Sequence, residues 1–478
     1  MAISTDILNG LKQPDISKID RLLSKAIEED ERKIVVLDDD PTGVQTVHDI
    51  YVYTGWDHES MLDGFRSDNK LFFILTNSRG FTEEETIKAH KEIAAAVMEA
   101  SRETGKDYIL ISRSDSTLRG HYPLETEVLK REIETNSDKR FDGEILCPFF
   151  REGGRYTIDN IHYVKYGDKL VPANETEFAA DRTFGYKAAT MPEYIEEKTG
   201  SRYRAEDVTC ISLEDLRAVN IEKITSQLLA VKDFGKVIVN AADYCDVKVF
   251  CIALYNAMKA GRTFMLRTAA AIVKVICGNP DRPLLSGAEM VQPGSGSGGV
   301  IVVGSHTAKT TAQLEQLKTV SGIEFAELDA TLVRDEKAFA AEVQRCIDFE
   351  ERCIRAGKTV CCYTTRALLT ADTGNKEDEL RLSVRISDAV QSLVGGLKAT
   401  PSFVIAKGGI TSSDVGTKAL KVKKALILGQ IKPGIPVWQT GAESRFPGVP
   451  YVIFPGNVGE DETLKEAAQE LIDNLRSR

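Results

Sequence analysis

The sequence predicts an α/β protein: two α/β domains with mainly parallel sheets and an interdomain cleft. Short apolar runs alternate with longer amphipathic stretches, which is the pattern of strand–helix–strand units. A stretch rich in Gly, Ser and Pro interrupts this rhythm before residue 300, and the rhythm then restarts. A chain of 478 residues is also long enough for two or three domains. We therefore expect a first domain over residues 1–285, a linker over 286–298 and a second domain over 299–478.

In the first half, apolar runs of strand length end in polar loops. The predicted strands cover residues 33–37, 50–54, 71–76, 108–112, 145–150, 208–212 and 236–240. Thr82 and Glu85 form a capping box that starts a helix, and Gly105 ends it. A further helix is expected over residues 122–134. Another follows the strand at 208–212 and ends at about residue 232, and a third follows the strand at 236–240 and ends at residue 260. Residues 159–204 are polar and are predicted to be irregular.

The second half repeats the pattern. Strands are expected over residues 300–303, 325–328, 359–363, 403–406 and 451–454. Long amphipathic stretches over 335–356 and 377–396 predict helices, and a final helix follows residue 460.

Composition excludes several classes of partner. The net charge is −11 and no Lys/Arg-rich block is present, so nucleic acid and anionic membrane are poor candidates. Nine cysteines without a CxxC pair predict reduced thiols and a cytoplasmic protein. The N-terminus lacks the features of a signal peptide, and no apolar run is long enough to span a membrane. No pattern of metal ligands is apparent, so no metal-binding residues are predicted, and homo-oligomerisation stays open.

The stretch from Asp38 to Gly43, DDDPTG, is the first candidate site. Three carboxylates follow a buried strand and precede a Pro/Gly turn, which is how open α/β sheets build sites at strand ends. Asp38 and Asp40 fit the DxDxT pattern of haloacid-dehalogenase-type phosphatases, in which the first Asp is the nucleophile. Asp39 and Asp40 with Thr42 and Gly43 fit the Asp-Asp-x-Thr-Gly loop of four-carbon acid sugar kinases instead. The stretch alone does not decide between them.

Three more loops of the first half follow strand ends and should meet the first at one sheet edge. They carry Asp115 with the cations Arg79, Arg119 and Arg155. Arginine suits bidentate binding of carboxylate or phosphate, and aspartate accepts hydrogen bonds from sugar hydroxyls. The plain structural alternative is that Arg119 and Asp115 pair with each other to hold their loop.

Glycine turns follow three strands of the second half. Gly304-Ser305 opens a helix, Gly408-Gly409 separates a strand from a helix, and Gly456 lies in a further turn. Free backbone N–H groups at such turns favour phosphate. The run from Gly304 to Thr310 is one residue short of a P-loop and lacks its second Gly, so it is not assigned as one. Three such turns in one domain favour a nucleotide site.

Taken together, the motifs resemble those of the four-carbon acid sugar kinase family over nearly the full chain. The matching motifs are Asp39-Asp40-Pro41-Thr42-Gly43, Thr76-Asn77-Ser78-Arg79, Asp115-Ser116-Thr117-Leu118-Arg119-Gly120, Gly154-Arg155-x-Thr157, Val303-Gly304-Ser305, Lys407-Gly408-Gly409-Ile410-Thr411 and Gly456-Asn457-x-Gly459. The resemblance implies a sugar-acid-binding domain followed by a nucleotide-binding domain. It also implies ATP-dependent phosphorylation of a small acid such as erythronate, threonate or a 3-oxo-tetronate, with Mg²⁺ accompanying ATP.

On this interpretation we assign roles to individual residues, and we expect the substrate carboxylate to contact Arg79 or Arg119. Asp115, or else Asp39, is expected as the general base. The substrate is expected to contact Asp39, Arg79, Asp115, Ser116, Arg119 and Arg155, and the nucleotide to contact Ser305, Gly408, Gly409, Ile410, Thr411 and Gly456. Pro41, His121 and the run 112–114 depart from the common family pattern, which leaves the exact acid open. The alternatives are a phosphatase using Asp38 and Asp40, and a non-catalytic ligand-binding or effector protein.

Overall fold

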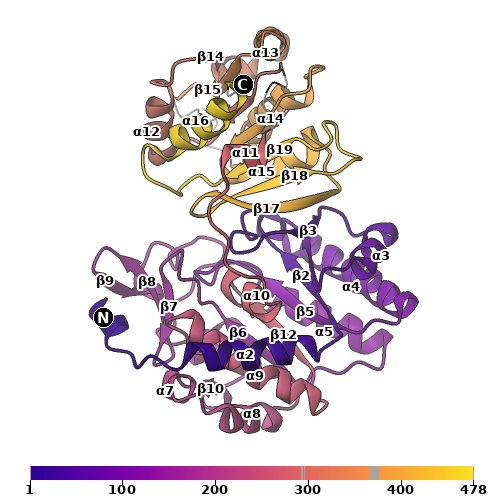
Figure 1. Cartoon of the computed structure of the whole chain (residues 1–478), viewed down its shortest axis with the longest axis vertical. Coiled ribbons are helices and arrows are strands. Elements are labelled where there is room, and N and C mark those ends of the chain that lie inside the picture. The colour runs from indigo at the N-terminus through magenta and orange to yellow at the C-terminus, as the bar shows by residue number, and fades with distance from the viewer. Residues whose placement is uncertain (1, 292–293, 295, 367–375, 477–478) are drawn as a thin grey trace. The chain divides into compact units, whose positions relative to one another are not determined.

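The computed structural model describes residues 2–291, 294, 296–366 and 376–476. Two compact units are formed (Figure 1). The N-terminal unit contains Met1–Val47 and Gly55–Asp281, and the C-terminal unit contains His48–Thr54 and Arg282–Arg478. Both units are α/β with mainly parallel sheets, so the predicted fold class is confirmed. The short segment His48–Thr54 belongs to the C-terminal unit although it lies early in the chain.

The main sheet of the N-terminal unit is parallel. Its strands, in spatial order, are β10 (Thr209–Ile211), β11 (Gly235–Val239), β6 (Gly143–Cys147), β12 (Phe264–Thr268), β5 (Tyr108–Arg113), β2 (Lys33–Asp38) and β4 (Leu71–Leu75). Strands β2, β4 and β5 are buried along their whole length, as expected for a parallel sheet covered on both faces. Strand β12 was not predicted.

Helices cover both faces of this sheet (Figure 1). The helices of this unit include α1 (Asp6–Asn9), α2 (Ile16–Glu28), α3 (His58–Arg66), α4 (Glu83–Thr104), α5 (Leu124–Asn136), α7 (Leu213–Arg217), α8 (Ile221–Ala230), α9 (Tyr244–Lys259) and α10 (Ala270–Ile276). The connections through α4 and α5 run along the sheet in one direction, and those through α8 and α9 run in the other. Right-handed crossovers therefore put the two pairs on opposite faces. The predicted capping box of Thr82 and Glu85, and the stop at Gly105, are confirmed.

The region predicted to be irregular is largely folded, so that prediction is wrong. Strands β7 (Arg155–Ile158), β8 (Ile161–Tyr166), β9 (Lys169–Pro172) and β1 (Ile3–Ser4) form an antiparallel sheet, and α6 (Met191–Lys198) follows. Asp159 and Asn160 join β7 to β8 with φ angles of 50° and 63°, a two-residue turn with both residues left-handed. The strands are too short, and their turns too polar, to stand out by periodicity.

The sheet of the C-terminal unit is mixed. Its spatial order is β3 (Ile50–Tyr53), β17 (Lys424–Lys432), β18 (Ile435–Thr440), β19 (Pro450–Phe454), β16 (Val404–Lys407), β13 (Val300–Val303), β15 (Thr359–Thr364) and β14 (Ile323–Leu328). The strands from β19 to β14 are parallel, whereas β3, β17 and β18 pair antiparallel.

The helices of this unit pack against that sheet. They are α11 (Gly287–Met290), α12 (Ala308–Leu317), α13 (Glu336–Arg355), α14 (Lys376–Gly395), α15 (Gly409–Asp414) and α16 (Thr463–Arg476). Helix α11 lies inside the stretch predicted as a linker, and Met290 and Val291 join the apolar core of the unit.

In the parallel part of each sheet, the connections between strands change direction at one point. In the N-terminal unit the chain leaves β2 toward β4 and leaves β5 toward β6, so this point lies between β2 and β5. In the C-terminal unit the chain leaves β13 toward β14 and leaves β16 toward β19, so it lies between β13 and β16. Ligands of open α/β sheets bind at the carboxyl ends of strands at such points.

Candidate functional site

Charged side chains of opposite sign meet at the switch point of the N-terminal sheet. Asp38 ends β2 and Arg113 ends β5, and the two residues are register partners. Arg113 Nη1 donates to Asp38 Oδ1 at 2.9 Å, and both side chains are buried. This pair lies directly beneath the loops after β2 and β5, which carry the predicted aspartates.

Arg79 lies between two aspartates of the loop after β2. Its Nη2 and Nε donate to Asp39 Oδ1 and Oδ2 at 2.7 and 3.2 Å, and its Nη1 donates to Asp40 Oδ2 at 3.1 Å. The side chain comes from a single turn of 3-10 helix, Ser78–Gly80, after β4. Each of its three nitrogens is therefore engaged, and Arg79 orients two carboxylates. The predicted contact with a substrate carboxylate would require one of these bonds to break.

Asp38 lies beneath its loop and is only 1% exposed. A Cβ atom on Gly43 would lie 2.1 Å from Asp38 Oδ2, so only glycine lets the loop close over this carboxylate. Burial raises the pKa of Asp38 to about 7, against the opposing effect of Arg113. A phosphatase nucleophile must be ionised and must reach its phosphoester. The position of Asp38 therefore argues against the phosphatase interpretation.

The loop after β5 carries Asp115 and Arg119, and the two residues pair. Arg119 Nε donates to Asp115 Oδ2 at 2.7 Å, and the Thr117 hydroxyl donates to the same oxygen. No described residue donates a hydrogen bond to Asp115 Oδ1. Burial acts to raise the pKa of Asp115, but Arg79 and Arg119 outweigh it and hold that pKa well below its usual range. Asp115 is thus an ionised carboxylate with one oxygen free.

The backbone of this loop is anchored by the small antiparallel sheet and the segment after it. Leu118 has a φ of 70°, a left-handed conformation that a leucine adopts only when its surroundings enforce it. Three successive carbonyls accept side-chain hydrogen bonds: Ser116 O from His162 Nε2 at 2.7 Å, Thr117 O from Tyr186 Oη at 3.0 Å, and Leu118 O from Tyr194 Oη at 2.8 Å. The region that sequence analysis left irregular therefore fixes the most distinctive motif of the chain.

Arg119 and Arg155 share one aromatic ring. Their guanidinium carbons lie 5.1 and 5.4 Å from the centre of the Phe178 ring, within range of cation–π attraction. Arg155 starts β7, donates from Nη1 to Gly153 O, and keeps a buried Nε without a partner. Arg119 is also 3.9 Å from Asp181. The structure thus brings two of the three predicted arginines together.

Two charged residues at the same strand ends were missed by sequence analysis. Arg267 lies in β12, and its Nη2 is 3.8 Å from Glu125 Oε2 at the start of α5. The same nitrogen donates to Arg119 O at 3.4 Å. Strand β12 is followed directly by apolar α10, so the sequence reads as one apolar stretch. A polar pair, Arg267-Thr268, inside that stretch was the available signal.

The glycine turns of the C-terminal unit meet at its switch point. A cavity of about 350 Å³ is lined by Gly304, Ser305, His306, Ser383, Ile386, Ser387, Val390, Gly408, Gly409, Ile410 and Thr411. Five of the six predicted nucleotide-binding residues are in this lining. The sixth, Gly456, lies next to it, because a Cβ atom there would be 3.3 Å from Ser305 Oγ. The side chain of Ile410 is 74% exposed, whereas Thr411 is buried.

Close backbone approach explains two of these glycines. A Cβ atom on Gly304 would lie 2.3 Å from Thr411 Oγ1. Gly408 has a φ of 126°, and its Cβ atom would lie 3.0 Å from Ser305 Cβ. Side chains at either position would push the loops after β13 and β16 apart. The glycines thus keep backbone N–H groups and the hydroxyls of Ser305 and Thr411 close together, a donor set that suits phosphate oxygens.

Lys407 ends β16, directly before the glycine turn that lines this cavity, and was not among the predicted contacts. Its Nζ donates to Pro455 O at 2.5 Å and to Gly456 O at 3.2 Å, and it has no carboxylate partner among the described residues. Gly456 O also accepts from the hydroxyls of Thr307 and Thr310. Burial, with a smaller effect of Lys309, lowers the pKa of Lys407 to about 7. A cation without an anionic partner fits a site for phosphate.

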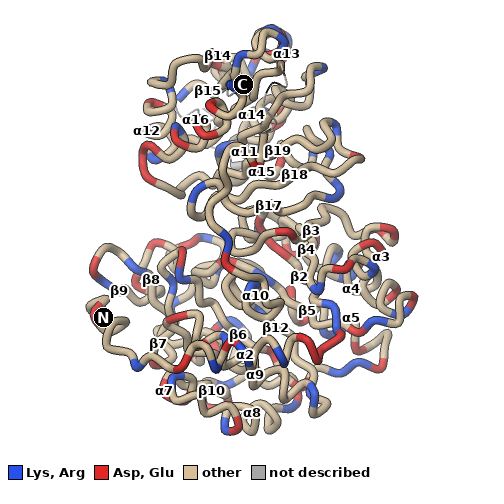
Figure 2. The backbone as a smooth tube through the Cα atoms, in the orientation of Figure 1, with Lys and Arg blue, Asp and Glu red and all other residues tan. Residues whose placement is uncertain are grey.

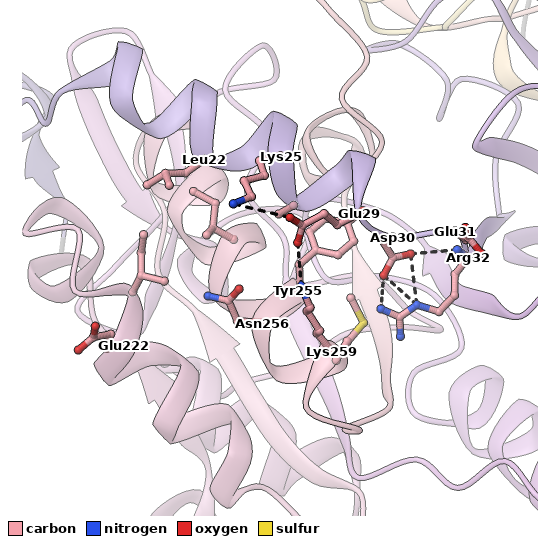
Figure 3. Close-up of a pocket in the computed structure, with 14 residues that line it drawn as sticks. Leu22, Lys25, Glu29, Asp30, Glu31, Arg32, Glu222, Tyr255, Asn256 and Lys259 are labelled. Carbon is pink, nitrogen blue, oxygen red and sulfur yellow. Dashed lines mark hydrogen bonds and ion pairs between the residues drawn. The ribbon is translucent and has the colours of Figure 1, made fainter.

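A cavity with a larger volume, about 730 Å³, lies elsewhere, between α2 and α9 of the N-terminal unit (Figure 3). Several of its charged groups pair with one another: Glu29 contacts Lys259 at 2.8 Å and Lys25 at 3.7 Å, and Arg32 pairs with Asp30. No strand end and none of the predicted site residues line it. The candidate functional sites are therefore the two switch points, one in each unit.

Acidic and basic residues are interspersed along both units (Figure 2). Among the described residues, no group of three or more His, Cys, Asp or Glu side chains could hold a metal by itself. Every described helix falls short of the length or the apolar character that crossing a bilayer requires. None of the nine cysteines, all of which lie in the described part of the chain, forms a disulfide.

Two family models match the chain. Residues 34–276 match a sugar-binding N-terminal domain, and residues 300–464 match a nucleotide-binding C-terminal domain. Comparison with curated proteins gave no significant match. These matches fall on the two units whose strand-end clusters are described above.

Two solved structures share this fold at low sequence identity, and a third has a lower structural similarity. Haemophilus influenzae protein HI1011, of family DUF1537, is 17% identical with a TM-score of 0.62, covering 92% of this chain and 100% of its own. A Salmonella typhimurium protein with the provisional name tRNA synthase is 15% identical with a TM-score of 0.65, covering 92% and 99%. A Bordetella bronchiseptica domain of unknown function with bound citrate, a domain-swapped dimer, is 20% identical with a TM-score of 0.38, covering 92% and 99%.

The order of the two domains and the matching motifs agree with the resemblance noted in the sequence. The chain belongs to the family that joins a sugar-binding N-terminal domain to a nucleotide-binding C-terminal domain, the architecture of the four-carbon acid sugar kinases.

Proposed function

We propose that the protein is an ATP-dependent kinase that phosphorylates a hydroxyl group of a small sugar acid. The observation that carries the proposal is that one chain contains two different clusters of side chains at strand ends. One is an Asp/Arg cluster in the sugar-binding domain, and the other is a glycine and hydroxyl cradle in the nucleotide-binding domain. Phosphoryl transfer needs positioned ligands and charge neutralisation more than covalent catalysis, and these clusters supply both.

The sugar acid binds, in this proposal, at the ends of β2 and β5. Asp39 and Asp115 accept hydrogen bonds from its hydroxyls, and Arg119 and Arg155 provide positive charge on the side of Phe178. Asp115 is the better candidate for general base. Both carboxylate oxygens of Asp39 are bound by Arg79, whereas Asp115 keeps Oδ1 free. Asp115 is also the more exposed of the two, with 12% of its side chain accessible against 3%.

ATP binds in the cavity between β13 and β16 and supplies the phosphoryl group. Ser305, Gly408, Gly409, Thr411 and Gly456 contact its phosphates through backbone N–H groups and hydroxyls, and Lys407 adds positive charge once it is protonated. The exposed side chain of Ile410 offers apolar surface to the base. Mg²⁺ accompanies ATP and is held mainly by phosphate oxygens, as is usual where a protein offers few carboxylates. We propose a cytoplasmic location for this activity.

The test is ADP release from ATP in the presence of four-carbon sugar acids, including both threonate and erythronate stereoisomers and 3-oxo-tetronates. Neutral four-carbon polyols serve as the matched control. Phosphate release from a generic phosphoester is measured in parallel. Acid-dependent ADP release is the expected result. Phosphoester hydrolysis without acid-dependent ADP release would overturn the kinase proposal in favour of the phosphatase, and inactivity in both assays would favour a binding protein.

A further inference from the structure

Arg366 lies just beyond the carboxyl end of β15, the strand that pairs with β13 in the C-terminal sheet. Its Nη2 donates to Ser305 O at 2.7 Å and to Thr311 Oγ1 at 2.8 Å. Ser305 lines the candidate nucleotide cavity, and so does His306, whose Nε2 lies 3.1 Å from Thr365 O. The end of β15 therefore borders the wall of this cavity, and Arg366 is the charged side chain that it carries there.

Most of the hydrogen-bonding capacity of Arg366 is unused. A guanidinium group has five N–H donors, and the two bonds above use only those of Nη2. Nε and Nη1 are buried and have no hydrogen-bond partner. Arg366 also makes no ion pair with a carboxylate in the described part of the chain. Buried donors are nearly always satisfied in folded proteins, so these two nitrogens call for an acceptor.

The electrostatic surroundings of Arg366 favour an anion. Thr311 lies near the N-terminus of α12, where the positive end of the helix dipole disfavours a cation. Burial lowers the pKa of Arg366, and nearby glutamates offset this effect only in part. Lys407 lies on the other side of the loop after β13, since its main-chain oxygen accepts from Ser305 N at 3.4 Å. Two cations without a carboxylate partner among the described residues thus flank one loop of the cavity.

We propose that Arg366 binds a phosphate group of the nucleotide. This inference rests on the proposed kinase function and adds a residue to its nucleotide site. A phosphate group offers negative charge and several acceptor oxygens, which complement both the charge of Arg366 and its unpaired N–H groups. The residue is half-buried, so rotation of its side chain turns Nε and Nη1 toward the cavity that Ser305 and His306 line. The phosphates then lie between Arg366 and Lys407.

The experiment is calorimetric titration of the full-length protein with adenosine, ADP and a non-hydrolysable ATP analogue, in the presence of Mg²⁺. The variant is Arg366→Gln, which removes the charge and the unpaired N–H groups. Arg445→Gln is the matched control, because Arg445 also donates to a main-chain carbonyl of the same unit, Leu397 O, and does not line the cavity. Arg366→Gln should weaken binding of ADP and of the ATP analogue about 10-fold or more, as expected for losing a charge-assisted hydrogen bond. Adenosine binding, measured by competition with ADP, should not change, and the control should bind all three as the wild type does.

Adenosine separates a phosphate contact from a structural role. If Arg366 only holds the loop through Ser305 O, Arg366→Gln should weaken adenosine and ADP by the same factor, and the inference is wrong. ADP affinity equal to that of the wild type would also overturn the inference and leave the kinase proposal standing. A wild-type protein that binds neither ADP nor the ATP analogue would refute the nucleotide site, and the proposed function and this inference would fail together. Should Arg366→Gln not fold, Arg366→Lys gives the same comparison, with ADP binding weakened several-fold and adenosine binding unchanged.

Discussion

Replacing Arg79 with lysine tests whether this residue orients aspartates or binds substrate directly. Lysine keeps the charge but donates from one point, so it cannot keep both bonds to Asp39 and the bond to Asp40. Losing one bond to the buried Asp39 costs about 1.5–3 kcal/mol, the range for hydrogen bonds to charged groups. The Asp40 bond is partly exposed and adds about 0.5–1 kcal/mol. We expect Arg79→Lys to lower the free energy of unfolding by about 2–4 kcal/mol.

The assay combines denaturant unfolding with kcat/KM for a sugar acid and its matched polyol. Arg66→Lys is the control, since Arg66 makes one exposed ion pair with Glu103 on α4. If Arg79 orients Asp39, the variant loses stability, and kcat/KM falls by a similar factor for both substrates. Unchanged stability together with a loss confined to the acid would show that Arg79 contacts the carboxylate, and the positioning role would be refuted.

Three further predictions follow from the geometry. Asp115→Asn should reduce kcat at least about 100-fold while substrate binding persists, as is typical for loss of a general base; steady-state kinetics and calorimetry measure the two effects. Gly408→Ala should weaken ADP binding about 10-fold or more, because alanine is strained at a φ of 126°. Gly409→Ala is the control and should weaken ADP binding much less, because its Cβ atom would meet nothing within 4 Å. Burial lowers the pKa of His162 from 6.5 to about 4, so its stabilising effect is present above pH 6.5 and is lost as pH falls through 4. His162→Gln should flatten this acid limb of the stability profile, measured as melting temperature against pH.

Each of these has a clear contrary result. Near-normal kcat in Asp115→Asn would remove Asp115 from the base role and leave Asp39. Equal nucleotide affinity in Gly408→Ala and Gly409→Ala would show that close approach of the loops after β13 and β16 is not needed. A stability profile of His162→Gln that parallels the wild type between pH 6.5 and 4 would mean that protonation of this residue does not govern the limb.

The fold class could be read from the sequence because buried parallel strands are continuous apolar runs. The run from Val300 to Val303 matches strand β13 at both ends, and the capping box at Thr82 starts α4 as expected. Strand β12 was missed because it runs into apolar α10 with no turn residue between them. Strand β3 was expected, but its place in the C-terminal unit depends on pairing with β17, a contact far along the chain that local patterns do not encode.

The candidate site, like the fold, could be predicted from the sequence only in part. Strand-end position identified Asp39, Asp115 and the glycine turns, because parallel strands put their ends at one edge. It could not show that Arg79 binds the aspartates of its own cluster, since the choice of partner depends on side-chain geometry. Arg267 was missed together with its strand, because β12 runs into apolar α10.

The proposed activity is transfer of a phosphoryl group from ATP to a sugar acid. The most direct measurement is phosphorus NMR of the wild-type protein incubated with ATP, Mg²⁺ and each four-carbon acid. A new phosphomonoester signal that grows in step with ADP, and that is absent with Asp115→Asn, is the predicted result. ADP and inorganic phosphate without a phosphomonoester, or no consumption of ATP with any acid, would contradict it.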